Sequence, residues 1–115
     1  MKKIMIIDDD PINTQILKWM LKGKELEVIT FQSHLGIEKL LDQLQPDLLI
    51  MDIQLDGANG CEICTELKMN SSYSSLPILL TSSNEEYYDE GCLADGFISK
   101  PYNKIGLFSS IDGFI

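Results

Sequence analysis

Two apolar segments of this chain each end in aspartate. The segment at 4–7 is followed by Asp8–Asp10, and the segment at 48–51 is followed by Asp52. If both segments are strands of a parallel α/β sheet, their carboxyl ends meet at the edge where such folds bind ligands. Carboxylates held close together repel one another unless a cation neutralises them. The pattern therefore predicts a metal site at this edge.

Two further predicted strand ends bring groups that suit phosphoryl transfer to the same edge. Ser82 follows the apolar segment 77–81, and Lys100 follows the segment 97–99. A hard divalent cation such as Mg²⁺ prefers carboxylate oxygens, and an aspartate can attack phosphorus to form an acyl phosphate. The cation, a hydroxyl and an ammonium would then share the charge of the phosphoryl oxygens. Thr81 remains an alternative to Ser82 as the hydroxyl.

The apolar pattern alternates between strand and helix, which is typical of a parallel sheet with helices on both faces. Strands are expected at 3–7, 27–31, 47–51, 77–81 and 97–99, and helices between Pro11 and Gly23, between Ser33 and Pro46, at 61–69, at 84–92 and from Lys104 onward. Asp10 before Pro11 is predicted to cap the first helix rather than to bind metal, and Ser33 to cap the second.

The first and last helices are each expected to bury one apolar face. The residues predicted to point inward are Ile12, Ile16, Leu17, Met20 and Leu21 in the first helix, and Ile105, Phe108, Ile111 and Ile115 in the last. Trp19 lies beside the first of these faces, so we expect it to pack at the edge of the core.

Length, charge and cysteine content limit the function. The 115 residues suit one domain, residues 1–115, and a net charge of −9 disfavours direct contact with nucleic acid. The apolar runs are too short for a membrane helix or a signal peptide, so we expect a cytoplasmic protein without membrane contact. Cys61 and Cys64 match the C-x-x-C spacing of thiol oxidoreductases, but Cys64 falls in an apolar helical stripe. We therefore favour core packing over redox chemistry or zinc binding.

These features together resemble the receiver domain of bacterial response regulators. The residues that carry the resemblance are Asp8, Asp9, Asp52, Gly60, Ser82 after the Pro77–Thr81 strand, and the run Phe97 to Pro101 that contains Lys100. The resemblance implies a flavodoxin-like, doubly wound, five-stranded parallel sheet in the order 2-1-3-4-5, a (βα)5 fold with helices on both faces. It also implies a phosphoprotein of a two-component system rather than an enzyme that acts on other substrates.

The resemblance assigns a role to each matching residue. Asp52 corresponds to the phosphorylated aspartate, Asp9 to the acid that binds Mg²⁺ or Mn²⁺ directly, and Asp8 to its neighbour acting through water. The backbone carbonyl of Gln54 corresponds to the remaining metal ligand.

Residues at the two later strand ends correspond to the family's switch. Ser82 corresponds to the switch hydroxyl, Phe97 to the switch aromatic residue, and Lys100 to the lysine that pairs with the phosphoryl group. The peptide bond to Pro101 is cis in the family. The implied partners are a histidine kinase or histidine phosphotransfer protein, and a downstream protein target or fused output domain.

Other interpretations stay open at this stage. The chain could be a degenerate receiver that acts only as a binding module. It could also be an aspartate-nucleophile phosphatase of the haloacid-dehalogenase type, whose Asp-x-Asp motif is matched by Asp8–Asp10. That family needs a later acid pair that is missing after Pro101. The segment for a fourth helix is short and the last helix contains Gly106 and Gly113. We therefore expect the family's symmetric dimer through these helices to be weak or absent.

Overall fold

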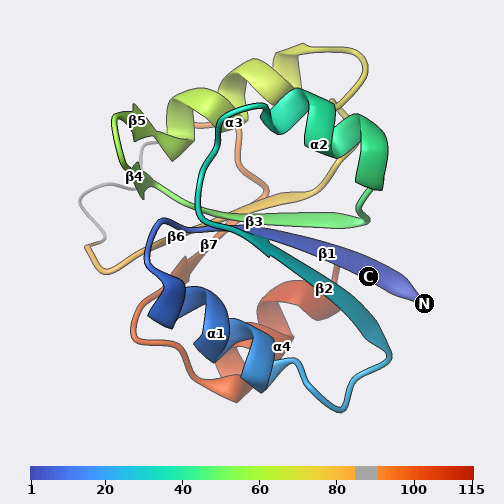
Figure 1. Ribbon diagram of the computed structural model, residues 1–115, viewed down its shortest axis with the longest axis vertical. Coiled ribbons are helices and arrows are strands. Elements are labelled where there is room, and N and C mark those ends of the chain that lie inside the picture. Colours follow the sequence, from blue (N-terminus) through green and yellow to red (C-terminus); the bar gives the residue numbers. More distant parts are fainter. Residues whose placement is uncertain (85–90) are drawn as a thin grey trace.

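Five parallel strands form the central sheet of the computed structural model, which describes residues 1–84 and 91–115 (Figure 1). The strands are β1 (Lys2–Ile7), β2 (Leu26–Phe31), β3 (Leu48–Asp52), β6 (Ile78–Ser82) and β7 (Gly96–Ser99). Their order across the sheet is β2-β1-β3-β6-β7, and each neighbouring pair is parallel. Numbered as five strands, this is the order 2-1-3-4-5, so the predicted doubly wound α/β fold is confirmed.

Helices cover both faces of this sheet. Helices α1 (Pro11–Met20) and α4 (Lys104–Asp112) lie on one face, and α2 (Ile37–Leu44) and α3 (Gly60–Met69) lie on the other (Figure 1). All residues of the central strands β3 and β6 are buried because both of their faces are covered. Successive strand residues face opposite layers, so the apolar side chains form two clusters, one under each pair of helices.

The buried face of α1 differs from the predicted one. Leu17 and Leu21 are buried as expected, but Ile12 is 65% exposed and Ile16 is 37% exposed. The helix carries two apolar stripes, and the sheet covers the stripe that contains Thr14 rather than the one with the isoleucines. The Thr14 hydroxyl is satisfied by donating to the Pro11 carbonyl at 3.0 Å, which allows this polar residue to be buried.

Trp19 belongs to the exposed stripe of α1 and does not pack at the core edge. Its side chain is 65% exposed, and the Lys104 ammonium lies 5.2 Å from the centre of its ring. An i, i+7 spacing from Ile12 places both residues on the same side of the helix. The prediction of core-edge packing for Trp19 is therefore wrong.

Helix α4 differs from the prediction at one residue, because Phe108 and Ile115 pack against the apolar cluster as expected but Ile105 does not. Leu107 and Ile111 are buried, whereas Ile105, which was expected to point inward, is 82% exposed. The helix is capped by Asn103, whose side-chain oxygen accepts the Gly106 N–H at 2.7 Å. Leu107 and Ile111 are four residues apart and therefore lie on the same side of the helix. When this side faces the sheet, Ile105 lies on the outside.

The second helix begins later than expected. The Ser33 hydroxyl accepts the Leu35 N–H at 3.1 Å in a turn that precedes the helix, and α2 starts after Gly36, which has a φ of 73°. Ser33 is therefore not its cap. The predicted helix at 84–92 falls largely on residues 85–90, which lie outside the described residues.

The cysteines pack as structural residues. None of the three forms a disulfide among the described residues, and Cys61 and Cys64 are buried in the apolar cluster beneath α2 and α3. Burial, with a smaller effect of the neighbouring Cys92, raises the pKa of Cys64 to about 12. A thiol with so high a pKa is a poor nucleophile, which agrees with core packing. No helix in residues 1–84 and 91–115 has the length and apolarity to cross a membrane.

Candidate functional site

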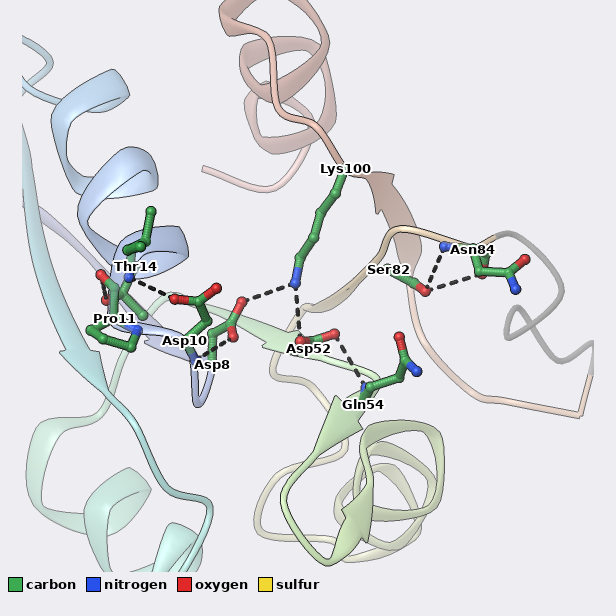
Figure 2. A network of polar contacts seen from close by, with 10 residues as sticks. Asp8, Asp10, Pro11, Thr14, Asp52, Gln54, Ser82, Asn84 and Lys100 are labelled. Carbon is green, nitrogen blue, oxygen red and sulfur yellow. Dashed lines mark hydrogen bonds and ion pairs between the residues drawn. The ribbon is translucent and has the colours of Figure 1, made fainter.

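Three charged residues from three strand ends meet at the carboxyl edge of the sheet. Asp8 follows β1, Asp52 is the last residue of β3, and Lys100 follows β7. The Lys100 ammonium lies 3.1 Å from Oδ2 of Asp8 and 3.0 Å from Oδ2 of Asp52 (Figure 2). The side chains of the two aspartates are only 3% and 9% exposed, and that of Lys100 is 14% exposed. The structure thus brings together residues that are far apart in the sequence.

Backbone N–H groups orient both carboxylates. The second oxygen of Asp8 accepts the Asp10 N–H at 2.9 Å, and the second oxygen of Asp52 accepts the Gln54 N–H at 3.2 Å. Each aspartate is therefore held by the backbone through one oxygen and by Lys100 through the other (Figure 2). Asp10 itself is exposed and caps α1 by accepting the Ile12 N–H at 2.9 Å, so its predicted role as a cap is confirmed.

Charge and burial oppose each other in this cluster. The pKa of Asp52 is raised: burial is the largest influence and raises it, the hydrogen bond and charge of Lys100 lower it, and the nearby Asp8 raises it further. Burial lowers the pKa of Lys100, but the hydrogen bond to Asp52 and the surrounding charges raise it by more. Lys100 therefore stays cationic at neutral pH, and the ionised form of Asp52 would be stabilised by additional positive charge.

Asp9 lies beside the cluster, and one of its oxygens lacks a partner. Its Oδ1 is buried and, among the described residues, forms no hydrogen bond. The residue borders a polar cavity of about 530 Å³. The cavity is also lined by Gln32, Ser33, His34, Leu35, Asp56 and Gly57. A buried carboxylate oxygen without a hydrogen-bond donor is destabilised unless a cation or water reaches it.

The donor set suits a hard divalent cation. The described residues contain no ready-made cluster of three acid, histidine or cysteine side chains in metal-binding geometry. The edge nevertheless offers an oxygen of Asp9 that has no partner among the described residues, and Asp9 directly follows Asp8, one of the two carboxylates that share a single ammonium. Oxygen donors of this kind, completed by carbonyl oxygens and water, are what Mg²⁺ prefers.

Helix α3 approaches the site closely because of two residues at its beginning. A Cβ atom at Gly60 would clash with the Asp52 carbonyl oxygen and would lie 2.9 Å from the Cα of Ile53, so only glycine fits there. Asn59 caps the helix, and its side-chain oxygen accepts the Cys61 N–H at 2.8 Å. The preceding loop also contains the short antiparallel strands β4 (Gln54–Leu55) and β5 (Ala58–Asn59), which the sequence did not indicate.

The Ser82 hydroxyl is buried but is turned away from Asp52. It donates to the Asn84 carbonyl at 3.0 Å and accepts the Asn84 N–H at 3.1 Å (Figure 2). Phe97 is half-buried on β7 and packs against the cluster beneath α2 and α3. The Lys100–Pro101 peptide bond is cis, as the resemblance implied.

Sequence reasoning missed Tyr102, which lies next to this site. Its ring packs against the apolar cluster beneath α1 and α4, and its hydroxyl is buried without a hydrogen-bond partner among the described residues. Burial, opposed in part by Thr81 and Lys100, raises the pKa of Tyr102 to about 12. The sequence signal was a polar aromatic residue directly after the Lys-Pro pair, at a position that packs against apolar side chains.

Comparisons with known proteins agree with this geometry. The family model described as "Response regulator receiver domain" matches residues 4–112. The polar-differentiation response regulator DivK of Brucella ovis is 26% identical over 118 residues, which cover 99% of this chain and 96% of that protein. The DNA-binding transcriptional activator EvgA of Escherichia coli is 26% identical over 112 residues, and the match covers 94% of this chain but 54% of EvgA. The chain thus spans about half the length of the latter relative.

Solved structures show the same fold. The response regulator TrrA of Thermotoga maritima, crystallised in complex with Mg²⁺ and BeF, matches with a TM-score of 0.89 at 25% identity, and the match covers 100% of each chain. The receiver domain of the sensor histidine kinase PA1611 of Pseudomonas aeruginosa has a magnesium ion in its active-site cleft. It matches with a TM-score of 0.84 at 17% identity over 98% of this chain and 96% of that chain.

Proposed function

The chain belongs to the response regulator receiver domain family, and from this premise we propose that Asp52 accepts a phosphoryl group and thereby switches the domain between two states. The observation that carries the proposal is the ammonium of Lys100, which lies within 3.1 Å of the buried carboxylates of Asp8 and Asp52. A structural ion pair needs only one acid for each base. The second acid leaves the cluster with excess negative charge at the edge where α/β sheets bind ligands.

In the proposed reaction, the carboxylate of Asp52 attacks the phosphorus of a phosphodonor. An O–P bond forms as the bond between phosphorus and its leaving group breaks, and the product is an acyl phosphate. Lys100 neutralises charge on the phosphoryl oxygens, and the backbone N–H of Gln54 holds the attacking carboxylate in position. Hydrolysis by water restores Asp52, so the domain acts only on its own acyl phosphate and is not an enzyme for other substrates.

A divalent cation, Mg²⁺ or Mn²⁺, is part of this proposal. Asp9, Asp8, Asp52 and the backbone carbonyl of Gln54 would hold it, and the unpartnered oxygen of Asp9 supports this choice. When bound, the cation supplies positive charge close to the phosphoryl oxygens. Without it, the site holds more acid than base, and the carboxylates repel an incoming phosphodonor.

The switch itself would begin at Ser82. In the present state its hydroxyl is held by the backbone of Asn84. A phosphoryl group on Asp52 offers stronger, charged acceptors, and hydrogen bonds to charged groups contribute about 1.5–3 kcal/mol each. Movement of Ser82 toward the phosphoryl group, accompanied by Phe97, would shift the population to a second conformation.

The proposed partners follow from this chemistry. A histidine kinase or a histidine phosphotransfer protein would donate the phosphoryl group, and a downstream protein or a fused output domain would read the switched state. EvgA is a DNA-binding activator, but this chain covers only 54% of it and carries a net charge of −9. Contact with DNA would therefore have to come from a different protein segment. A cytoplasmic location stays a prediction.

Labelling with acetyl phosphate and Mg²⁺ tests the proposal. Intact-mass spectrometry should find one phosphoryl group on the wild type, none on Asp52→Asn, and one on the control Asp10→Asn, whose side chain is an exposed helix cap. Sustained turnover that depends on Asp8 would instead indicate the phosphatase. Absence of any adduct on a folded protein would indicate a binding module.

A further inference from the structure

The hydroxyl of Tyr102 has no structural explanation in the unphosphorylated state. It is buried, and among the described residues no group donates to it or accepts from it. Buried polar groups in proteins are nearly always hydrogen-bonded because leaving one unpaired is unfavourable. Phenylalanine would fill the same space in the apolar cluster beneath α1 and α4 without this cost. We therefore expect the Tyr102 oxygen to form a hydrogen bond in another state of the site.

Lys100 is the group that can supply this partner. An ammonium has three N–H donors, and among the described residues Lys100 uses two of them, one on Asp8 and one on Asp52. Tyr102 follows Lys100 by two residues, across the cis peptide bond between Lys100 and Pro101, and the two groups are near enough to influence each other's pKa. Within residues 1–84 and 91–115, one ammonium N–H of Lys100 and the hydroxyl of Tyr102 therefore take part in no hydrogen bond.

Thr81 completes the surroundings of the hydroxyl. It is 1% exposed, and it lies in β6 on the same face as Leu79, which belongs to the cluster that Tyr102 contacts. The Thr81 side chain is near the Tyr102 hydroxyl, although the two do not meet in hydrogen-bond geometry. A small movement would let the Tyr102 O–H donate to Thr81 while the Tyr102 oxygen accepts from Lys100.

We propose that Tyr102 is a positioning residue for Lys100: its hydroxyl oxygen accepts the third ammonium N–H when Asp52 carries a phosphoryl group. This inference rests on the proposed function. Phosphorylation moves the negative charge of Asp52 outward onto the phosphoryl oxygens, and the ammonium must follow it. A third hydrogen bond, from the ammonium to the Tyr102 oxygen, then fixes the direction in which the ammonium points, while the Tyr102 O–H donates a hydrogen bond to the Thr81 oxygen.

The variant Tyr102→Phe removes only the oxygen and tests the inference directly. Beryllium fluoride with Mg²⁺ serves as the phosphoryl mimic, and its affinity is measured by calorimetric titration. The variant should bind it about tenfold more weakly, the loss expected for one hydrogen bond to a charged group. Its melting temperature without the mimic should equal or exceed that of the wild type, because no hydrogen bond is lost in that state.

Tyr73→Phe is the matched control. The Tyr73 hydroxyl donates a hydrogen bond to Oδ1 of Asp42 at 2.6 Å. Tyr73 lines a cavity with Pro46 and Pro77, which precede β3 and β6, so it lies at the opposite end of these strands from Asp52. The control should therefore melt at a lower temperature but bind the mimic with unchanged affinity. A loss of affinity without a loss of melting temperature in Tyr102→Phe, and the reverse in Tyr73→Phe, would show that Tyr102 positions Lys100 rather than supporting the fold in general.

A spectroscopic signal distinguishes positioning from packing. In a ¹H–¹⁵N spectrum of lysine ammonium groups with the mimic bound, the Lys100 protons should exchange with water more slowly in the wild type than in Tyr102→Phe. Equal exchange, or equal affinity for the mimic, would overturn the inference and leave the proposed function intact as long as acetyl phosphate labels Asp52. A wild type that takes neither acetyl phosphate nor the mimic would overturn both.

Discussion

At the scale of single residues, one ammonium shared by two buried carboxylates sets the charge balance of the site. Asp8 and Asp52 repel each other, and Lys100 is the cation in the described structure that lies within 4.0 Å of both. A further positive charge would therefore stabilise the cluster.

Asp52→Asn should make the metal-free protein more stable at neutral pH. The pKa of Asp52 is raised on folding from its ordinary value of 3.8, chiefly by burial. The folded protein thus binds this proton more tightly than the unfolded chain does. As pH rises through the folded pKa, the proton is lost and the ionised carboxylate lowers the free energy of unfolding. The advantage of the variant should be full above the folded pKa and shrink as pH falls toward 3.8.

Urea denaturation across a pH series measures this difference. Asp10→Asn serves as the control, because an exposed aspartate cap exchanged for asparagine keeps the capping oxygen. Added Mg²⁺ should stabilise the wild type more than Asp52→Asn. A variant that is less stable than the wild type at neutral pH, without metal, would contradict the predicted charge balance.

Lys100→Met should destabilise the protein by about 3 kcal/mol, because it leaves two buried carboxylates without a counter-charge. Mg²⁺ should restore part of the loss. Lys39→Met is the control, since Lys39 is exposed on α2 and an exposed charge contributes little. Equal free energies of unfolding for the two variants, measured in urea, would show that Lys100 does not balance the cluster.

The residues of the site could be predicted from the sequence where the topology of the sheet alone brings them together. Parallel strands end at one edge, so Asp8, Asp52 and Lys100 could be brought together from their positions alone. The orientation of Ser82 could not, because its hydroxyl is held by the backbone of Asn84 rather than by a sequence pattern. Tyr102 was missed because an aromatic residue after a strand is ordinarily read as core.

At the scale of elements, α3 sets the geometry around Asp52. Its first residue, Gly60, contacts the Asp52 backbone so closely that no side chain fits, and the atoms involved belong to the backbone and cannot rotate away. The position of this helix is thus coupled directly to the position of the nucleophile.

Gly60→Ala should therefore cost about 1–3 kcal/mol of stability, as expected for forced overpacking, and should also lower the rate of labelling by acetyl phosphate. Gly113→Ala is the matched control: Gly113 has a φ of −74° and nothing lies within 4 Å of an added Cβ. This control should be neutral or slightly stabilising. Equal stability and labelling of the two variants would refute the role given to the close approach.

The type and order of the elements were predictable, but their rotation was not. Alternating strand and helix patterns with a proline start at Pro11 indicated the fold. Helix α1 carries two apolar stripes, and burial of Thr14 selected the one that does not contain Ile12. Periodicity alone cannot choose between two such stripes when a threonine can satisfy its own hydroxyl.

At the scale of the whole molecule, charge opposes self-association. The chain carries 18 acids against 9 lysines or arginines, so two copies repel each other at low ionic strength. Helix α4 is short, Lys104–Asp112, and contains a glycine at position 106. Both features agree with the expectation that the family's symmetric dimer is weak or absent in this chain.

Sedimentation velocity with Mg²⁺ and beryllium fluoride checks this expectation. The protein should sediment as a monomer at low salt, both with and without the mimic. Raising the salt concentration screens the repulsion, so any association should increase with salt. A stable dimer that forms at low salt only when the mimic is present would contradict the prediction.

Identifying the residue that acetyl phosphate modifies decides whether Asp52 is the phosphorylated residue. After treatment with acetyl phosphate and Mg²⁺, borohydride reduces an acyl phosphate of aspartate to homoserine, which peptide mass spectrometry can place in the sequence. Homoserine is expected at position 52 and at no other position, and none is expected without Mg²⁺. Homoserine at position 8 or 9 instead, or an unmodified chain under conditions where the protein is folded, would contradict this expectation.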